Sequence, residues 1–136
     1  MKKKIGRKIV KKAAKKAAKK VKKDDLLEII IDAIQEKKGD NLVVLDLREL
    51  KSRVCDHFVI CEGRSTTQVS AIADSVKFEV KKKLTQMPYH SEGYSNSEWV
   101  LIDYVNIVVH VFQPQIREFY NIEGLWADAE VKHYNS

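Results

Sequence analysis

Residues 98–126 read EWVLIDYVNIVVHVFQPQIREFYNIEGLW, and this stretch decides the fold class. Its two apolar runs, WVLID (99–103) and IVVHVF (107–112), have strand length and are separated by three residues, a spacing typical of a β-hairpin. Pro114 cannot donate to a strand ladder, so the second strand is expected to end before it. Helical turns should follow and pack through five apolar side chains: Ile116, Phe119, Tyr120, Leu125 and Trp126. The stretch therefore predicts a sheet with helical structure packed against it.

Two further apolar runs lie upstream of the hairpin, at residues 41–47 and 57–61. Neither run alternates with polar residues, which indicates strands that are buried on both faces. Residues 88–94 add a short extended segment that is closed by Gly93. Together these segments predict a mixed sheet of about five strands.

Two helices are predicted around the upstream strands. The first should begin at Asp24, a good N-cap, and end at Gly39, with two lysines in its last turn. The second should begin with a capping box formed by Ser65 and Gln68, and Pro88 prevents its continuation. Its predicted buried stripe is Val69, Ile72, Ala73, Val76, Val80 and Leu84. The order of elements indicates an α/β or α+β domain, a mixed sheet flanked by helices.

The formal net charge of +6 is unevenly distributed along the chain. Residues 1–23 hold thirteen Lys and Arg and no acid, whereas residues 24–136 hold twelve bases against nineteen acids, a charge of −7. The sequence therefore predicts a basic Lys-rich extension (1–23), one domain (24–128) and a loose polar C-terminal tail (129–136). The extension is either a solvated segment or an arm that contacts phosphates, such as those of rRNA. A mitochondrial presequence is disfavoured because the extension has one Arg and no Ser.

Residues suited to catalysis or metal binding are sparse. Cys55 and Cys61 form no CxxC pair, and the four histidines share no metal-ligand spacing. Two-metal phosphoryl transfer needs paired carboxylates, and the strand after the second helix offers only Asp103, with Val105 two residues on. We therefore expect no enzyme activity, no cofactor and no metal site. The alternative is a nucleotide-binding or nucleotidyltransferase-like enzyme that acts at the Gly63–Gln68 turn, where a helix begins and can attract phosphate.

The hairpin strands are apolar on both faces, and a hairpin at a sheet edge can leave one face uncovered. An exposed apolar patch of that kind usually marks a site for a protein partner. Trp99 belongs to the residue type most enriched at interface hot spots, and plain core packing is the alternative for it. His110 shares a strand face with Val108 and Phe112 and is expected to be half-buried and hydrogen-bonded. The hairpin is therefore a better candidate for docking than for catalysis.

Several motifs occur together in the body of the chain: D-x-F-V-I-x-x-G-x-S at 56–65, E-G at 92–93, W-V-L-x-D-Y at 99–104, and V-V-H-V-F at 108–112. R-E-F-Y and L-W follow at 117–120 and 125–126. This combination resembles the ribosomal silencing factor S family, also called Iojap, over roughly residues 24–128.

The resemblance implies a nucleotidyltransferase-like fold without that chemistry. It implies a repressor of translation under nutrient limitation that binds ribosomal protein L-fourteen on the large ribosomal subunit and sterically blocks association with the small subunit. An acidic body suits a basic ribosomal partner. The expected location is the bacterial cytoplasm rather than an organelle, with no membrane association, and a homodimer of the free protein is one further expectation.

By position in the motifs, the resemblance places three hairpin residues at the ribosomal contact: Trp99, Val100 and Asp103. Tyr104 and His110 are further candidates for partner binding. The chain departs from the family at Val105 and Asn106, where members often have a glycine followed by an acid. The expected contact therefore rests on the strands rather than on the loop between them.

Overall fold

The hairpin has the bounds that its sequence predicts. The structure, a computed structural model, describes residues 23–134, so the basic extension lies outside the described residues except for its last position. β4 (Trp99–Asp103) and β5 (Ile107–Phe112) pair antiparallel. Val105 makes the turn with a φ of 76°, and the Asp103 carboxylate accepts a hydrogen bond from the Val105 N–H at 2.7 Å. The side chain of Asp103 thus stabilises the turn in which a β-branched residue has a left-handed conformation.

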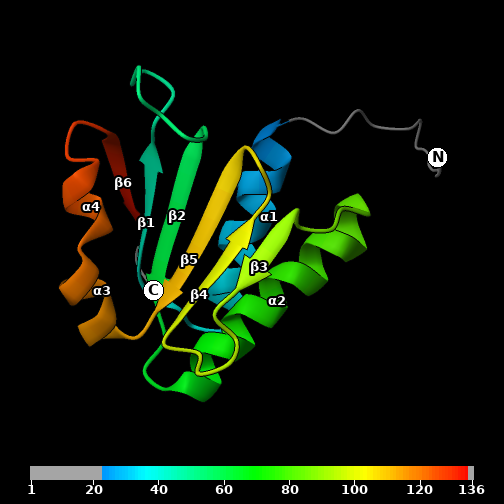
Figure 1. Cartoon of the computed structure of the whole chain (residues 1–136). Helices are drawn as coiled ribbons and strands as arrows, with labels where there is room; N and C mark the ends of the chain where they lie inside the picture. The colour runs from blue at the N-terminus through cyan, green and yellow to red at the C-terminus, as the bar shows by residue number, and fades with distance from the viewer. Residues whose placement is uncertain (1–22, 135–136) are drawn as a thin grey trace, which may run out of the picture.

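The other strands extend this hairpin into one sheet with the order β3-β4-β5-β2-β1-β6 (Figure 1). β1 (Asp40–Asp46) and β2 (His57–Glu62) pair antiparallel, and β2 runs parallel to β5. β3 (His90–Glu92) forms the edge next to β4, and β6 (Glu130–Tyr134) forms the edge next to β1. The prediction of a mixed sheet flanked by helices is confirmed, with 6 strands instead of about five.

The sixth strand contradicts the expectation of a loose polar ending. β6 pairs antiparallel with β1 from Glu130 opposite Asp46 to Tyr134 opposite Leu42. All but the last of its side chains are exposed. The strand is therefore held by its backbone pairing with β1, and residues 130–134 belong to the sheet.

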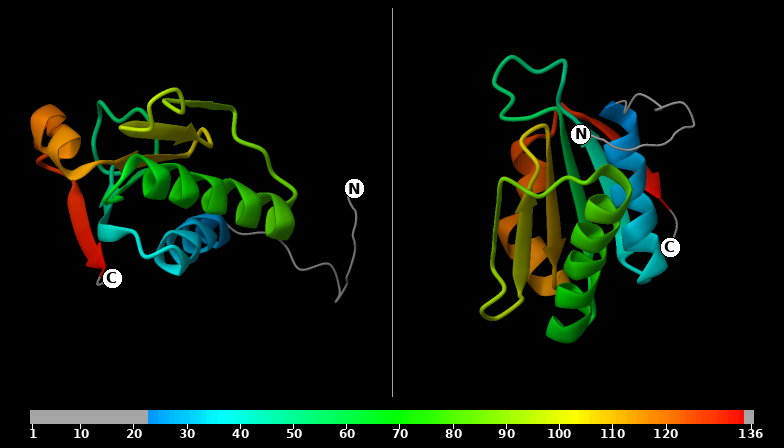
Figure 2. Two further views of the ribbon diagram at one scale, coloured as in Figure 1. Left: turned by 90° about the horizontal axis from the view of Figure 1, so that it is seen from below. Right: turned by 90° about the vertical axis from the view of Figure 1, so that its right-hand side faces the viewer.

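Two antiparallel helices cover one face of the sheet, α1 (Lys23–Glu36) and α2 (Thr66–Leu84) (Figure 2). Gln68 Nε2 donates to the carbonyls of Lys37 and Lys38, so the start of α2 lies beside the end of α1. Farther along, Ser75 Oγ donates to the carbonyl of Ala33 at 3.1 Å. The stripe predicted for α2 is buried, apart from Leu84, which is half-buried.

The predicted helix ends need small corrections. α1 already includes Lys23, so Asp24 lies within the helix rather than just before it. The helix ends at Glu36, before the two lysines, and Lys38 rather than Gly39 takes the left-handed φ, at 60°. The left-handed conformation of Lys38 lets the N–H groups of Lys38 and Gly39 donate to the carbonyls of Gln35 and Ile34, and this closes the helix.

Two short helices lie against the opposite face, α3 (Pro114–Tyr120) and α4 (Ile122–Leu125). Ile116 and Trp126 pack against the core as predicted. Phe119, Tyr120 and Leu125 are exposed instead, which corrects the prediction that all five apolar side chains of this region pack inward.

Arg117 connects these helices to the sheet through hydrogen bonds. Its buried guanidinium donates to the Asn41 carbonyl at 2.8 Å and to Glu62 at 3.1 Å. It also makes two hydrogen bonds with Glu123 of α4, at 2.9 and 2.8 Å. One side chain therefore fixes the position of α3 and α4 on the sheet. The position of these helices in turn sets how much of this face they cover.

Candidate functional site

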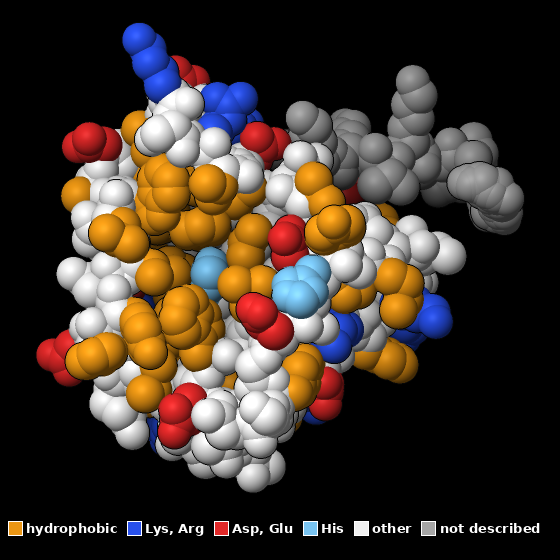
Figure 3. All heavy atoms as spheres, in the orientation of Figure 1, with side chains coloured by type: hydrophobic (Ala, Val, Ile, Leu, Met, Phe, Trp, Pro, Cys, Tyr) orange, Lys and Arg blue, Asp and Glu red, His pale blue; other side chains and the backbone are white. Residues whose placement is uncertain are grey.

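The face of the sheet opposite α1 and α2 is only partly covered. α3, α4 and their neighbours pack over β1 and β2, whereas three side chains of β4 on the same face stay half-exposed: Trp99, Leu101 and Asp103. Glu92 of β3 and the exposed Tyr120 of α3 border them. We call these five residues the Trp99 face. Figure 3 shows hydrophobic side chains gathered over the strands on this side of the molecule.

Trp99 is held in place by other rings. Its indole stacks on the fully buried Phe112 with 4.8 Å between ring centroids and 29° between planes. Tyr120 packs against it at 4.9 Å. A half-exposed tryptophan that is supported from below loses little freedom when a partner covers it, which favours tight binding.

His110 lies directly under this face. Trp99 Nε1 donates a hydrogen bond to His110 Nδ1 at 3.1 Å, and Phe58 packs its ring edge to face against the imidazole at 4.7 Å. Because an indole N–H can only donate, Nδ1 must accept and the proton of the neutral ring is on Nε2. His110 is 4% exposed, its Nε2 has no hydrogen-bond partner, and burial lowers its pKa to about 4. The ring is therefore neutral near pH 7 and orients Trp99.

The β3 side of the Trp99 face is acidic. Glu92 pairs across the strands with Leu101, so its carboxylate borders the apolar centre, and it lies 3.3 Å from Nε2 of His90. The half-exposed Asp103 carboxylate lies at the same edge, opposite His90. Gly93 makes the chain reversal at this edge with a φ of 99°, and a Cβ there would meet the carbonyl oxygen of Trp99. An apolar centre with carboxylates at its margin is complementary to an apolar and basic partner.

The five residues singled out from the sequence lie on two different faces. Trp99 and Asp103 are on the open face, and His110 is buried beneath it. Val100 and Tyr104 point to the other side, into the core under α1 and α2, with 0% and 3% exposure. Strand alternation separates these sets, and it also identifies Leu101, which the sequence analysis did not select, as a neighbour of Trp99 on the open face.

Comparisons with known proteins identify the family of the chain. A family model described as "Ribosomal silencing factor during starvation" matches residues 18–136. The chain belongs to the ribosomal silencing factor family. The ribosomal silencing factor RsfS of Halalkalibacterium halodurans is 39% identical over 105 residues, 77% of this chain and 88% of that protein. The RsfS of Bacillus subtilis is 38% identical, over 76% of this chain and 86% of that protein. A crystal structure from Chromobacterium violaceum matches with a TM-score of 0.74 and 34% identity, covering 79% of this chain and 88% of that one.

In this member of the silencing factor family, the polar groups of the turn at Gly63–Gln68 already have hydrogen-bond partners within the protein. Ser65 Oγ accepts from the Gln68 N–H at 3.1 Å, as the predicted capping box requires. The Gln68 side chain accepts from the N–H of Arg64 rather than from that of Ser65. The Arg64 side chain is paired with Asp40 at 3.1 Å. Much of the hydrogen-bonding capacity that could hold a phosphate at this turn is therefore already used.

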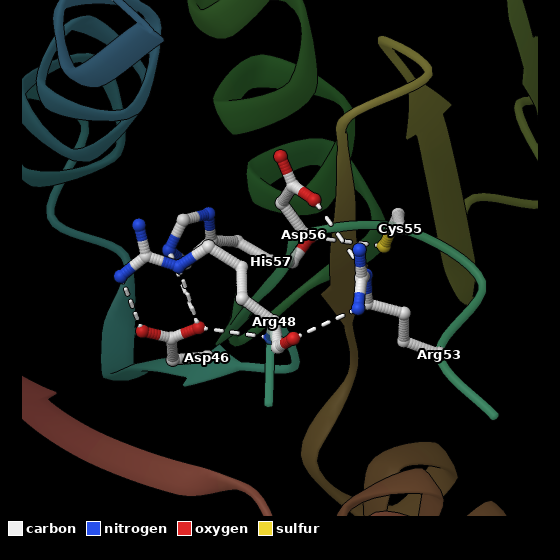
Figure 4. Close-up of polar contacts among 6 residues, drawn as sticks. All are labelled: Asp46, Arg48, Arg53, Cys55, Asp56 and His57. Carbon is white, nitrogen blue, oxygen red and sulfur yellow. Dashed lines mark hydrogen bonds and ion pairs between the residues drawn. The ribbon is translucent and has the colours of Figure 1, made fainter. Parts of the chain in front are cut away.

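A second polar cluster of this silencing factor lies where β1 ends and β2 begins (Figure 4). The Arg48 guanidinium makes two hydrogen bonds with Asp46, at 2.9 and 2.7 Å, and holds the pKa of that carboxyl at about 2. Arg53 donates to the Arg48 carbonyl at 2.8 Å and lies 4.0 Å from Asp56. These contacts fold the β1–β2 connection onto itself, which is a structural role.

The described residues offer little else for chemistry. Cys55 and Cys61 are free and buried, and burial raises the pKa of their thiols to about 11 and about 12. From Lys23 to Tyr134, no group of three or more His, Cys, Asp or Glu is placed to hold a metal ion. Within the same range, no helix has the length and apolar character needed to cross a membrane.

Proposed function

We propose that this silencing factor represses translation by binding ribosomal protein L-fourteen on the large ribosomal subunit. The bound protein blocks association with the small subunit sterically, and it does so in the bacterial cytoplasm when nutrients are limiting. It acts as a binding protein and not as an enzyme.

The observation that carries this proposal is the Trp99 face. It combines a half-exposed, ring-supported tryptophan with a second apolar side chain, Leu101, and with carboxylates at one margin. Such a surface suits a protein partner that offers an apolar patch beside basic side chains. Membership in the ribosomal silencing factor family directs the proposal to the ribosome.

The chemistry of the described residues supports a role without catalysis. The buried thiols have raised pKa values, and the turn at the start of α2 is occupied by its own side chains. Asp103, the one carboxylate that could have begun a two-metal site, stabilises the hairpin turn instead.

Co-sedimentation with purified large and small ribosomal subunits tests the proposal. The protein should pellet with large subunits and not with small ones, and it should reduce the formation of joined ribosomes. Pelleting with neither subunit, or binding to large subunits without any effect on joining, would overturn it. Magnesium-dependent binding of ATP in calorimetry would favour the enzymatic alternative.

Binding to isolated ribosomal protein L-fourteen locates the contact. Trp99→Ala should lose this binding, while Phe78→Ala, which removes an exposed ring from α2 on the opposite side of the sheet, should retain it. A second copy of the chain is the competing occupant of the Trp99 face. Light scattering of the wild type and of Trp99→Ala shows whether the same residue also governs self-association.

A further inference from the structure

The outer side of α2 near its C-terminal end combines an exposed aromatic ring with positive charge. Phe78 is 63% exposed, and Lys81 and Lys82 follow it at i+3 and i+4, so the three side chains share one face of the helix. Lys82 Nζ lies 5.9 Å from the centre of the Phe78 ring. We call Phe78, Lys81 and Lys82 the α2 ridge.

The lysines in and around the ridge differ in their contacts with other side chains. Lys83 forms an ion pair with Glu79 at 3.3 Å. Lys77 lies over the Tyr94 ring at 4.4 Å and donates to Ser91. Within the described part of the chain, Lys81 and Lys82 make no ion pair. Two exposed cations therefore remain available to a ligand.

The charge of the ridge is opposite in sign to the net charge of the body. Residues 24–136 carry a formal charge of −7, yet residues 77–83 contain four lysines and one glutamate. Lysines in a last helical turn stabilise the helix dipole, but that effect gives no reason for an exposed phenylalanine among them. A ring beside free cations is instead the combination that binds unpaired nucleotides, with bases stacked on the ring and phosphates on the cations.

The basic extension joins the body at the same end of the helix pair. α1 and α2 are antiparallel, so the start of α1 at Lys23 lies toward the end of α2. The basic extension, with thirteen bases in residues 1–23, therefore continues from the same end of the helix pair as the ridge.

We propose that the α2 ridge is an RNA-binding surface, with Lys81 and Lys82 on backbone phosphates and Phe78 stacked on an unpaired base. The ridge lies on the helix-covered side of the sheet, away from the Trp99 face, so the two surfaces can be occupied together (Figure 2). This inference does not depend on binding to L-fourteen.

The test measures binding of the full chain to a fluorescent unpaired RNA oligonucleotide and to a duplex of the same length. Salt is varied over roughly 50–200 mM. With unpaired RNA, Lys81→Gln/Lys82→Gln should reduce the slope of log affinity against log salt by about 1.4, roughly 0.7 for each phosphate that the variant no longer binds. Phe78→Ala should weaken binding of the unpaired RNA at least about fivefold and leave duplex binding nearly unchanged.

Matched variants separate this surface from general charge. Lys37→Gln/Lys38→Gln removes two exposed lysines from the opposite end of the helix pair and should change the slope clearly less. Trp99→Ala should bind RNA as the wild type does, so failure of the L-fourteen contact and failure of the RNA surface are distinguishable. Equal slopes for both lysine variants, or wild-type binding of unpaired RNA by a folded Phe78→Ala protein, would overturn the proposal.

Discussion

The indole N–H of Trp99 donates to Nδ1 of His110 at 3.1 Å, which links the most prominent residue of the open face to a ring that is almost fully buried. The bond fixes the orientation of the indole and the tautomer of the imidazole together. The orientation of a half-exposed ring and the protonation of a buried imidazole are therefore coupled through one hydrogen bond.

Replacing Trp99 should separate stacking from hydrogen bonding. Trp99→Ala should weaken binding to L-fourteen by about 2–4 kcal/mol, roughly 30-fold to 1,000-fold. Trp99→Phe keeps a ring over Phe112 but loses the donor to His110, so its effect on affinity should be smaller. Calorimetric titration measures both, and thermal unfolding of the same samples is the control. A folded Trp99→Ala protein with wild-type affinity would show that the contact lies elsewhere.

Protonation of His110 should make stability depend on pH in a defined window. Its pKa is about 4 in the folded chain, below the ordinary value near 6.5. Between these values the unfolded chain binds the proton first, so stability is full above pH 6.5 and falls as the pH drops toward 4. The total decrease in stability from this group is about 3 kcal/mol.

Urea unfolding at several pH values measures this dependence. His110→Phe should remove this pH dependence of stability. His133→Gln, a change at an exposed position on β6, should leave the pH dependence as it is in the wild type. Asp46, with a pKa of about 2, contributes stability that is lost only at lower pH, so it does not interfere. Identical pH profiles for the wild type and His110→Phe would refute the assignment.

The charge of Asp103 should matter less than the ring of Trp99. Asp103→Asn keeps an oxygen that can accept the hydrogen bond from Val105, so the turn is preserved and only the charge is removed. A charge at the rim of an interface acts mainly through the association rate and is screened by salt. Stopped-flow association with L-fourteen should therefore slow at low salt and match the wild type at high salt. A large, salt-independent decrease in affinity would instead indicate a buried contact for this carboxylate.

The turn residue Val105 should be a site of stored strain. Its φ of 76° is a conformation that β-branched residues rarely adopt, so Val105→Gly should raise the free energy of unfolding by about 1 kcal/mol. The control is Val54→Gly, since Val54 is also exposed in a connection but has no positive φ. That change should be neutral or slightly destabilising. Equal effects of the two substitutions in urea unfolding would contradict the strain.

Arg117 should contribute far more to stability than an exposed arginine with a similar partner. Arg117→Met removes the donor of the Asn41 carbonyl and one donor of Glu62, and it breaks both bonds to Glu123, so it should cost about 3 kcal/mol. Arg64→Met removes an ion pair of 3.1 Å from a side chain that is 82% exposed, and should cost less than about 1 kcal/mol. Chemical denaturation measures the free energy of unfolding of both variants. Equal decreases would show that burial does not determine how much the Arg117 network stabilises the fold.

The sequence predicts those parts of the fold that local pattern determines. The two hairpin strands have the bounds expected from their apolar runs, and the Ser65 cap is present because a hydroxyl at that position satisfies a free N–H of α2. β6 was missed because its side chains are mostly exposed and carry no apolar alternation. Backbone pairing with a distant strand leaves no trace in a local pattern.

The placement of the candidate residues on the two faces of the sheet could be predicted only in part, for a related reason. Alternation along β4 groups Trp99 with Leu101 and Val100 with Ile102, but it does not say which group the helices cover. The structure resolves this, with Val100 under α2 and Trp99 on the open side. The role of Arg117 was equally hidden, since its partners come from separate parts of the chain.

The pairing of β1 with β6 also has a consequence for synthesis. The chain is made from its N-terminus, so the residues of β1 and β2 are synthesised before those of β6. During that interval the outer edge of β1, with the apolar run Leu42–Leu45, offers unpaired backbone groups to any other chain. β6 covers this edge of β1 and replaces it with a strand whose side chains are mostly exposed and include charged ones, which disfavours pairing with other chains.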